Sequence, residues 1–187
     1  VRLVPCEPVA LDEDEAVLVA LPPGQTVLRR GAEDRIDLGA ASPLGTGVKY
    51  FGGVPYRLTD GWLTVAGPGW QGASAQAEVA LCGVRIAEIR TLGGVMHQAA
   101  DGKAAAAFEL VYADGSTARL PIACGRDVQD WFLMGHPEAK PAVRWEAPGL
   151  GLEYGLFNGV WRNPHPSRPV KTLRLLSRGT GITAVKD

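Results

Sequence analysis

Tryptophans set among turn-forming and polar residues carry the clearest chemistry of this sequence. Trp70 lies in "GPGWQG", Trp131 follows Asp127 in "GRDVQDW", and Trp145 follows Arg144. A flat aromatic ring can cover the apolar face of a sugar while planar polar groups hydrogen-bond the sugar hydroxyls. We therefore expect Trp70, Trp131, Arg144 and Trp145 to contact a carbohydrate, with Asp127 as a polar helper.

The stretch "WRNPHPSRPVKTLRLLS", residues 161–177, has two competing interpretations. Trp161, Asn163 and His165 either hold a ligand or shape a corner of the fold. The two prolines around His165 fix their own φ and push the residues before them toward extended geometry. We expect mainly a rigid corner leading into a strand at Val170. Trp161 is then a core residue, and Asn163 is kept as a polar ligand contact.

Few residues of the chain suit a metal site. Asp127 and Asp130 offer carboxylate oxygens, but calcium takes about six to eight oxygen ligands. The histidines His97, His136 and His165 are far apart and fit no metal-binding spacing. We expect no cofactor, with one structural calcium at the two aspartates as the alternative.

The cysteines Cys6, Cys82 and Cys124 are widely separated and odd in number. This spacing excludes a dense disulfide framework and a clustered zinc motif. One bridge with a spare thiol and three buried thiols both remain open. We favour buried thiols, because cysteine is often a small core residue.

Sequence motifs of catalysis are absent. The chain has no Gly-x-Ser-x-Gly elbow, no Walker loop and no dinucleotide fingerprint. We predict a protein without catalysis. Glycosidase carboxylates can be scattered in a sequence, so a polysaccharide-active enzyme stays as an alternative.

Composition narrows the classes of partner. The 187 residues carry 19 basic and 20 acidic side chains, so no basic surface for nucleic acid is expected. The longest apolar runs, such as "AVLVAL", are far shorter than the roughly 20 residues of a membrane span. The chain begins with Val1 and lacks the plan of a signal peptide, which suggests an excised or processed piece.

Short apolar runs between turns predict an all-β protein, in which 24 glycines and 14 prolines supply the turns. The firmest prediction is a hairpin over residues 107–123, where apolar residues alternate on both sides of "ADGS". A second hairpin is expected from residues 54–58 and 62–66 around "TDG".

Further strands are expected over residues 75–94, split at Gly83, and over 143–145, 153–161 and 170–176. The dipeptide "NG" at 158–159 signals a turn, but we favour one strand with Gly159 at a bulge. The last run alternates in a way that leaves neither face cleanly apolar. Together these strands predict an antiparallel β-sandwich or jelly roll over residues 35–187, with residues 1–34 as an N-terminal extension or edge strands.

Three stretches occur in the order and rough spacing of a known type of domain. They are "YFGGVPYRLTDGWLTVAG", "YADGSTARLPIACGRDVQDWF" and "WRNPHPSRPVKTLRLLS". In this order they resemble a bacterial galactose-binding-like β-sandwich domain. Such a domain carries a Gly-Val-Pro-aromatic strand, a Tyr-Ala-Asp-Gly hairpin before Gly-x-Asp-x-x-Asp-Trp, and a late Trp-x-Asn-Pro-His-Pro corner. The resemblance covers about residues 35–180, and "FLMGHPEAKPAV" replaces the second aromatic often found after Trp131.

The resemblance implies a non-catalytic accessory module of a secreted or periplasmic multidomain protein. Domains of this type resemble carbohydrate-binding modules and occur beside glycoside hydrolases or in envelope sensor proteins. The expected partners are a polysaccharide or glycan and neighbouring domains of the parent protein. A protein-interaction or scaffold domain without a sugar ligand is the main alternative, and it would show an exposed apolar patch. An enzyme would show two convergent carboxylates or a histidine–carboxylate pair in a cleft.

Overall fold

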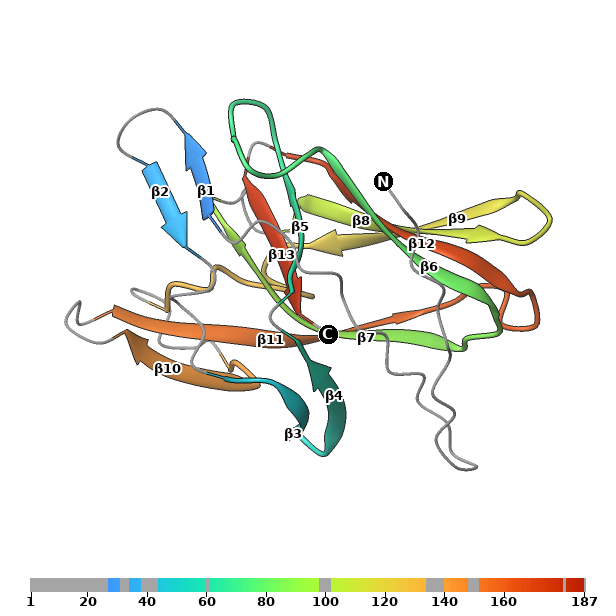
Figure 1. Cartoon of the computed structure of the whole chain (residues 1–187), viewed down its shortest axis with the longest axis horizontal. Helices are drawn as coiled ribbons and strands as arrows, with labels where there is room; N and C mark the ends of the chain where they lie inside the picture. The colour runs from blue at the N-terminus through green and yellow to red at the C-terminus, as the bar shows by residue number, and fades with distance from the viewer. Residues whose placement is uncertain are drawn as a thin grey trace.

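The structure, a computed structural model, confirms the all-β prediction (Figure 1). The described residues contain thirteen strands and no helix, and so no helix that could cross a membrane. Most neighbouring strands pair antiparallel, and the two larger sheets pack face to face as a sandwich. The described residues are 27–30, 34–37, 44–59, 61–97, 102–133, 140–147, 152–179 and 181–186.

Two sheets form the body of the molecule. The larger has the strand order β10-β11-β7-β13-β5, and the smaller has the order β6-β12-β8-β9. In that order the larger sheet consists of Val143–Ala147, Leu152–Arg162, Glu88–Met96, Ile182–Lys186 and Leu63–Ala66. The smaller consists of Gln76–Val84, Val170–Ser177, Ala104–Tyr112 and Thr117–Ala123.

The five-stranded sheet is buried on both faces. Along β7, Ile89 and Val95 join the hydrophobic cluster between the two sheets, whereas Leu92 and Met96 join a second cluster on the opposite face. Segments outside the two large sheets cover this second cluster, and Leu28 contributes a fully buried side chain to it. The molecule therefore has two cores, separated by one sheet.

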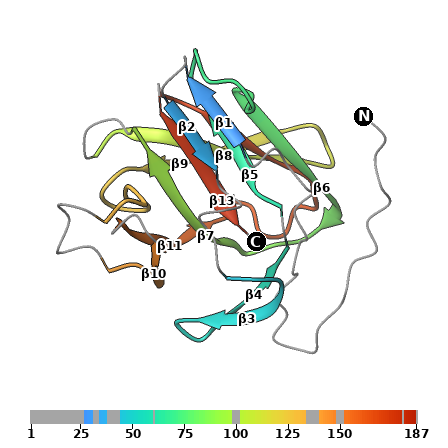
Figure 2. The same cartoon turned by 60° about the vertical axis from the view of Figure 1, so that its left-hand side comes forward.

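Two short hairpins complete the described fold. Strands β1 (Val27–Arg30) and β2 (Asp34–Asp37) pair with each other, as do β3 (Gly47–Phe51) and β4 (Val54–Leu58). Figures 1 and 2 both show the β3–β4 hairpin projecting from the body. The predicted extension, residues 1–34, thus includes β1, while residues 1–26 lie outside the described residues.

The hairpin expected from residues 54–66 is wrong in its pairing. Both strands exist, but β4 pairs with β3 and β5 pairs with β13. The tight turn lies instead at Gly52 and Gly53, whose φ angles are 60° and 80°. Two consecutive positive φ values suit the two-residue turn that joins antiparallel strands, and glycine adopts them without steric cost.

The remaining strand predictions are confirmed, with two adjustments. β8 and β9 form the expected hairpin, and β6 and β7 form the two expected strands but in different sheets. β11 runs as one strand through Asn158 and Gly159, without the register shift of a bulge. A Cβ at Gly159 would lie 2.0 Å from the ring of Trp161, so packing of this buried tryptophan accounts for the glycine.

A β-bulge in β12 changes which of its residues face the core. The register shifts between Val170 and Thr172, so Val170, Leu173 and Leu175 all pack on the core between the sheets. Simple alternation had placed Val170 on the opposite face from Leu173. The inner face is consequently apolar, and Arg174 lies on the outer face.

A row of alternating charges crosses that outer face. Arg174 lies 3.3 Å from Glu78 and 3.1 Å from Glu109, and Arg119 lies 2.7 Å from Glu109. The hydrogen bond from Arg119 lowers the pKa of Glu109, assisted by Arg174 and opposed by burial. This row gives the four-stranded sheet a balanced, hydrogen-bonded outer surface.

The cysteine prediction is confirmed at one position and wrong at another. Cys124 is buried, but Cys82 is an exposed thiol. Cys82 has a φ of 52° and precedes Gly83, whose φ is 81°, so an irregular end of β6 turns its side chain outward. Cys6 lies outside the described residues.

Candidate functional site

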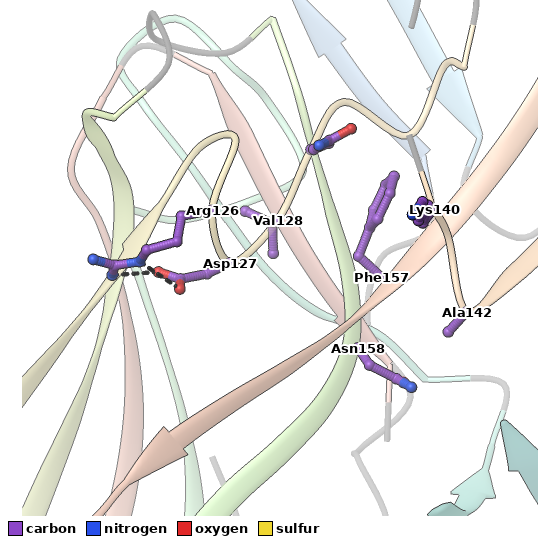
Figure 3. Close-up of a pocket in the computed structure, with 8 residues that line it drawn as sticks. Arg126, Asp127, Val128, Lys140, Ala142, Phe157 and Asn158 are labelled. Carbon is purple, nitrogen blue, oxygen red and sulfur yellow. Dashed lines mark hydrogen bonds and ion pairs between the residues drawn. The ribbon is translucent and has the colours of Figure 1, made fainter. Parts of the chain in front are cut away.

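A hollow of about 340 Å³ lies beside β11, where three parts of the chain meet (Figure 3). One wall comes from the segment after β9, another from the residues that lead into β10, and the third from β11 itself. Figure 3 shows Phe157 between the Arg126–Asp127 pair on one side and Lys140 on the other. The described lining residues are Arg126, Asp127, Val128, Gln129, Lys140, Ala142, Phe157 and Asn158.

The first wall is a tight turn that Asp127 holds. Its Oδ2 accepts a hydrogen bond of 2.8 Å from the amide of Ala123, and its own amide donates to the Ala123 carbonyl. Gly125 starts the turn with a φ of 78°. Arg126 donates two hydrogen bonds, of 2.8 Å and 2.7 Å, to the same carboxylate. Burial opposes the charged form of Asp127, but these hydrogen bonds prevail and lower its pKa.

The chain next inserts between two strands of the five-stranded sheet. Val95 of β7 donates to the Gln129 carbonyl and accepts from the Trp131 amide, and Gly155 of β11 donates to the Trp131 carbonyl. A Cβ at Gly94 would lie 2.9 Å from the Cβ of Trp131, so this glycine makes room for the inserted segment. The backbone of Gln129 is thereby fixed, while its side chain lines the hollow.

Strand β11 contributes the apolar Phe157 and the polar Asn158 to the lining of the hollow. Phe157 is 7% exposed and packs with Leu133 in a small hydrophobic cluster of its own. The next residue, Asn158, is bound to the β3–β4 hairpin: its Oδ1 accepts the Tyr56 hydroxyl at 2.9 Å, and its Nδ2 donates to the Phe51 carbonyl. Burial raises the pKa of Tyr56 to about 12, partly offset by Arg90, so this hydroxyl stays a donor.

Of the ligand contacts expected from the sequence, Asp127 alone is among the described residues that line this hollow. Trp131 is 1% exposed and packs edge-on against Trp62 and Tyr154. Trp70 is 6% exposed, with the Arg30 guanidinium 4.9 Å from its ring and the His97 ring 5.3 Å away. Both tryptophans are therefore buried and leave no ring face exposed to a sugar.

Trp145 and Arg144 lie on opposite faces of β10. Trp145 is half-buried and stacks on Tyr154, with ring centroids 5.7 Å apart and an interplanar angle of 12°. Its indole nitrogen is buried without a hydrogen-bond partner. Arg144 forms an exposed ion pair with Glu153 at 3.1 Å. The two neighbours in sequence therefore do not form one joint patch.

Asn163 lies at the other end of β11, in the expected corner. It is 5% exposed, and its Oδ1 accepts hydrogen bonds from the Tyr112 hydroxyl at 2.6 Å and from the His165 amide at 2.9 Å. Its Nδ2 donates to the Ile86 carbonyl at 2.8 Å. The His165 ring is exposed and lies edge-on to Tyr112. Asn163 thus joins three segments of the sandwich, and its side chain is occupied within the protein.

The two aspartates considered for calcium each accept a hydrogen bond from a backbone amide. Asp127 binds Ala123 and Arg126, and Asp130 accepts the Phe132 amide at 3.0 Å. Within the described part of the chain, no group of three or more histidine, cysteine, aspartate or glutamate residues could hold a metal ion.

Arg126, Gln129, Lys140 and Phe157 were not expected from the sequence. Arg126 lies between Gly125, which signals a turn, and Asp127, which was expected as a ligand contact. These two neighbours were therefore a usable signal for it. Lys140 precedes a proline in a stretch without periodicity, and nothing local indicates that it comes near Phe157. Comparison with known proteins adds no assignment: no family model matches the chain, and no curated protein matches it significantly.

Proposed function

We propose that this chain is a non-catalytic module that binds carbohydrate in the hollow beside β11. The observation that carries the proposal is a hollow in which the apolar Phe157 lies between Arg126 and Lys140 (Figure 3), with Gln129 also in the lining. An apolar surface edged by a few polar groups matches the two-sided chemistry of a sugar ring.

Two further features support this assignment. The order of motifs resembles galactose-binding-like sandwich domains, which suggests a secreted or periplasmic accessory domain of a larger protein. The carboxylate that the described lining contributes, Asp127, is already bound by Arg126 and the Ala123 amide. It is therefore poorly placed to act as a general acid or base, which favours binding over catalysis.

Affinity electrophoresis in gels containing plant or algal polysaccharides tests the proposal. We expect at least one polymer to retard the chain, and Arg126→Ala or Gln129→Ala to reduce that retardation. Arg126 has a 67% exposed side chain, so its removal should leave the fold intact. The matched control is Arg162→Ala, because Arg162 is exposed on β11 and is not among the lining residues.

The result also locates the site. Retardation that Trp145→Ala abolishes, and that the hollow variants leave unchanged, would place the sugar at the half-buried Trp145–Tyr154 stack instead. If no polymer retards the folded chain, carbohydrate binding is wrong.

A second candidate is a protein-interaction domain that uses the β3–β4 hairpin. Tyr50 is 69% exposed and Val48 is 51% exposed, and their alternate positions put both on one face of β3. Hydrogen exchange of this hairpin tests the alternative in the isolated chain and in the longer parent protein. Protection gained in the parent protein would support packing against a neighbouring domain, and equal exchange would count against it.

A further inference from the structure

Among the described lining residues of the hollow, the two cationic side chains keep unused hydrogen-bond donors. Lys140 is exposed, and its ammonium makes no hydrogen bond or ion pair with the described residues. Arg126 uses Nε and Nη2 on Asp127, which leaves Nη1 for another acceptor. Lysine and arginine side chains have no acceptor atoms. Gln129 adds one amide that can both donate and accept.

The acceptor oxygens of Asp127 and Asn158 in the same hollow already have hydrogen-bond partners. Both oxygens of Asp127 accept hydrogen bonds from Arg126, and Oδ2 also accepts from the Ala123 amide. The Oδ1 of Asn158 accepts from the Tyr56 hydroxyl. A neutral sugar hydroxyl is satisfied best when it both donates and accepts, whereas a carboxylate or sulfate only accepts. The unused groups therefore suit an anion better than a hydroxyl.

Charge points in the same direction. The described lining contains two cations, Arg126 and Lys140, and one anion, Asp127, which is already paired with Arg126. The Lys140 charge is left without a partner among the described residues. An anionic group on the ligand would pair with this charge and would accept a charge-assisted hydrogen bond from Lys140.

We infer that the ligand is an acidic carbohydrate whose carboxylate or sulfate groups are bound by Lys140 and Arg126, each on its own side of Phe157. This inference rests on the carbohydrate site proposed above. It adds the class of sugar and assigns Lys140 as the residue that selects for it.

A pair of polymers that differ only in charge tests the inference. Polygalacturonate and alginate are compared with the same polymers after reduction of their carboxyl groups to alcohols, and carrageenan serves as the sulfated arm. Binding is measured by affinity electrophoresis and by calorimetry at low and high salt. We expect about tenfold weaker binding after carboxyl reduction, and weaker binding of every acidic polymer in high salt. Binding of carrageenan in place of the uronates would identify sulfate as the anionic group.

Lys140→Gln removes the charge and keeps a polar side chain of similar length. We expect this variant to lose about tenfold in affinity for the acidic polymer and to bind the reduced polymer as the parent chain does. Lys171→Gln is the matched control, because Lys171 is exposed on β12 and is not among the lining residues.

The outcomes separate the two proposals. Equal binding of native and reduced polymers, or an unchanged affinity of Lys140→Gln for the acidic polymer, would overturn the acidic-sugar inference and leave carbohydrate binding intact. If neither charged nor neutral polymers bind, both proposals fail.

Discussion

The corner after β11 and the hollow beside the middle of that strand use polar side chains in opposite ways. At the corner, Asn163 is buried, and both atoms of its amide group are hydrogen-bonded to other parts of the protein. At the hollow, Lys140 is exposed and has no partner among the described residues. Both regions combine an aromatic ring with polar neighbours, which is the pattern that a sequence search for a sugar site selects. They differ in that the polar groups at the hollow keep unused hydrogen-bonding capacity, whereas those of Asn163 do not.

The contrast gives a physical criterion for a site. A buried group whose donors and acceptors are all used contributes to stability, and removing it leaves its former partners unsatisfied. An exposed group with unused donors contributes little to folding and remains available to a ligand. Mutations at the corner should therefore change the free energy of unfolding, and mutations at the hollow should change the affinity for a ligand.

The largest effect on stability is expected from Asn163→Ala. This change leaves the Tyr112 hydroxyl, the His165 amide and the Ile86 carbonyl without their partner. We expect a loss of about 3 kcal/mol in the free energy of unfolding, measured by urea denaturation. His165→Ala is the control and should cost less than about 1 kcal/mol, because its ring is exposed. Equal costs for the two variants would contradict the structural role of Asn163.

A smaller loss is expected from Gly159→Ala in the middle of β11. The added Cβ would lie 2.0 Å from the Trp161 ring, so the indole must move away from Phe108. We expect a cost of about 2 kcal/mol, measured in the same denaturation series. Val160→Ala, at an exposed neighbouring position, should change stability by less than about 1 kcal/mol. If Gly159→Ala proves as stable as Val160→Ala, then β11 tolerates a shifted tryptophan.

Asp127→Asn should have a moderate, pH-dependent effect at the hollow. The pKa of Asp127 in the folded protein lies below its ordinary value of 3.8, so its charge stabilises the fold above that pH. This contribution is lost as the pH falls through the lowered pKa. We expect the variant to be less stable by about 1 kcal/mol at pH 7, and this deficit to shrink as the pH falls below 3.8.

The control for this measurement is Glu146→Gln, which removes an exposed carboxylate outside the hollow. Its difference from the parent chain should stay small over the same range of pH. A deficit of Asp127→Asn that persists unchanged at low pH would mean that the Asp127 charge does not support the turn.

The smallest effect on stability is expected from Lys140→Gln. Lys140 is exposed and unpaired among the described residues, so its replacement should change the free energy of unfolding by less than about 0.5 kcal/mol. Thermal unfolding and denaturant titration would both measure it. A large loss would mean that Lys140 supports the fold, and the contrast between the corner and the hollow would not hold.

The positions of the strands could be predicted from the sequence more reliably than their pairing. Local alternation identifies the β8–β9 hairpin, because its two strands are neighbours in sequence and in space. Alternation also identifies β4 and β5, but it carries no information on the strand that lies beside each of them. The two glycines of the β3–β4 turn were a usable signal, because two positive φ angles in a row are typical of a hairpin.

The site was harder to predict because burial is a property of the whole fold. Glycines around a tryptophan accompany exposed loops, and they also permit close packing, as Gly94 does for Trp131 and Gly159 for Trp161. Asp127 could be found because its turn is local. Lys140 could not be found from the sequence, since it comes near Phe157 only when the segment before β10 and the strand β11 after it are both in place.

Burial of the five-stranded sheet on both faces has a consequence for the order in which parts of the molecule open. The amides of β7 lie between β11 and β13, with a hydrophobic cluster on either side. They can exchange with solvent only when both cores separate, so their exchange should report global unfolding. The β3–β4 hairpin pairs only with itself among the described strands. Its strand β4 places Tyr56 and Leu58 in the second core, so release of the hairpin disturbs one core, whereas exposure of β7 requires both cores to open.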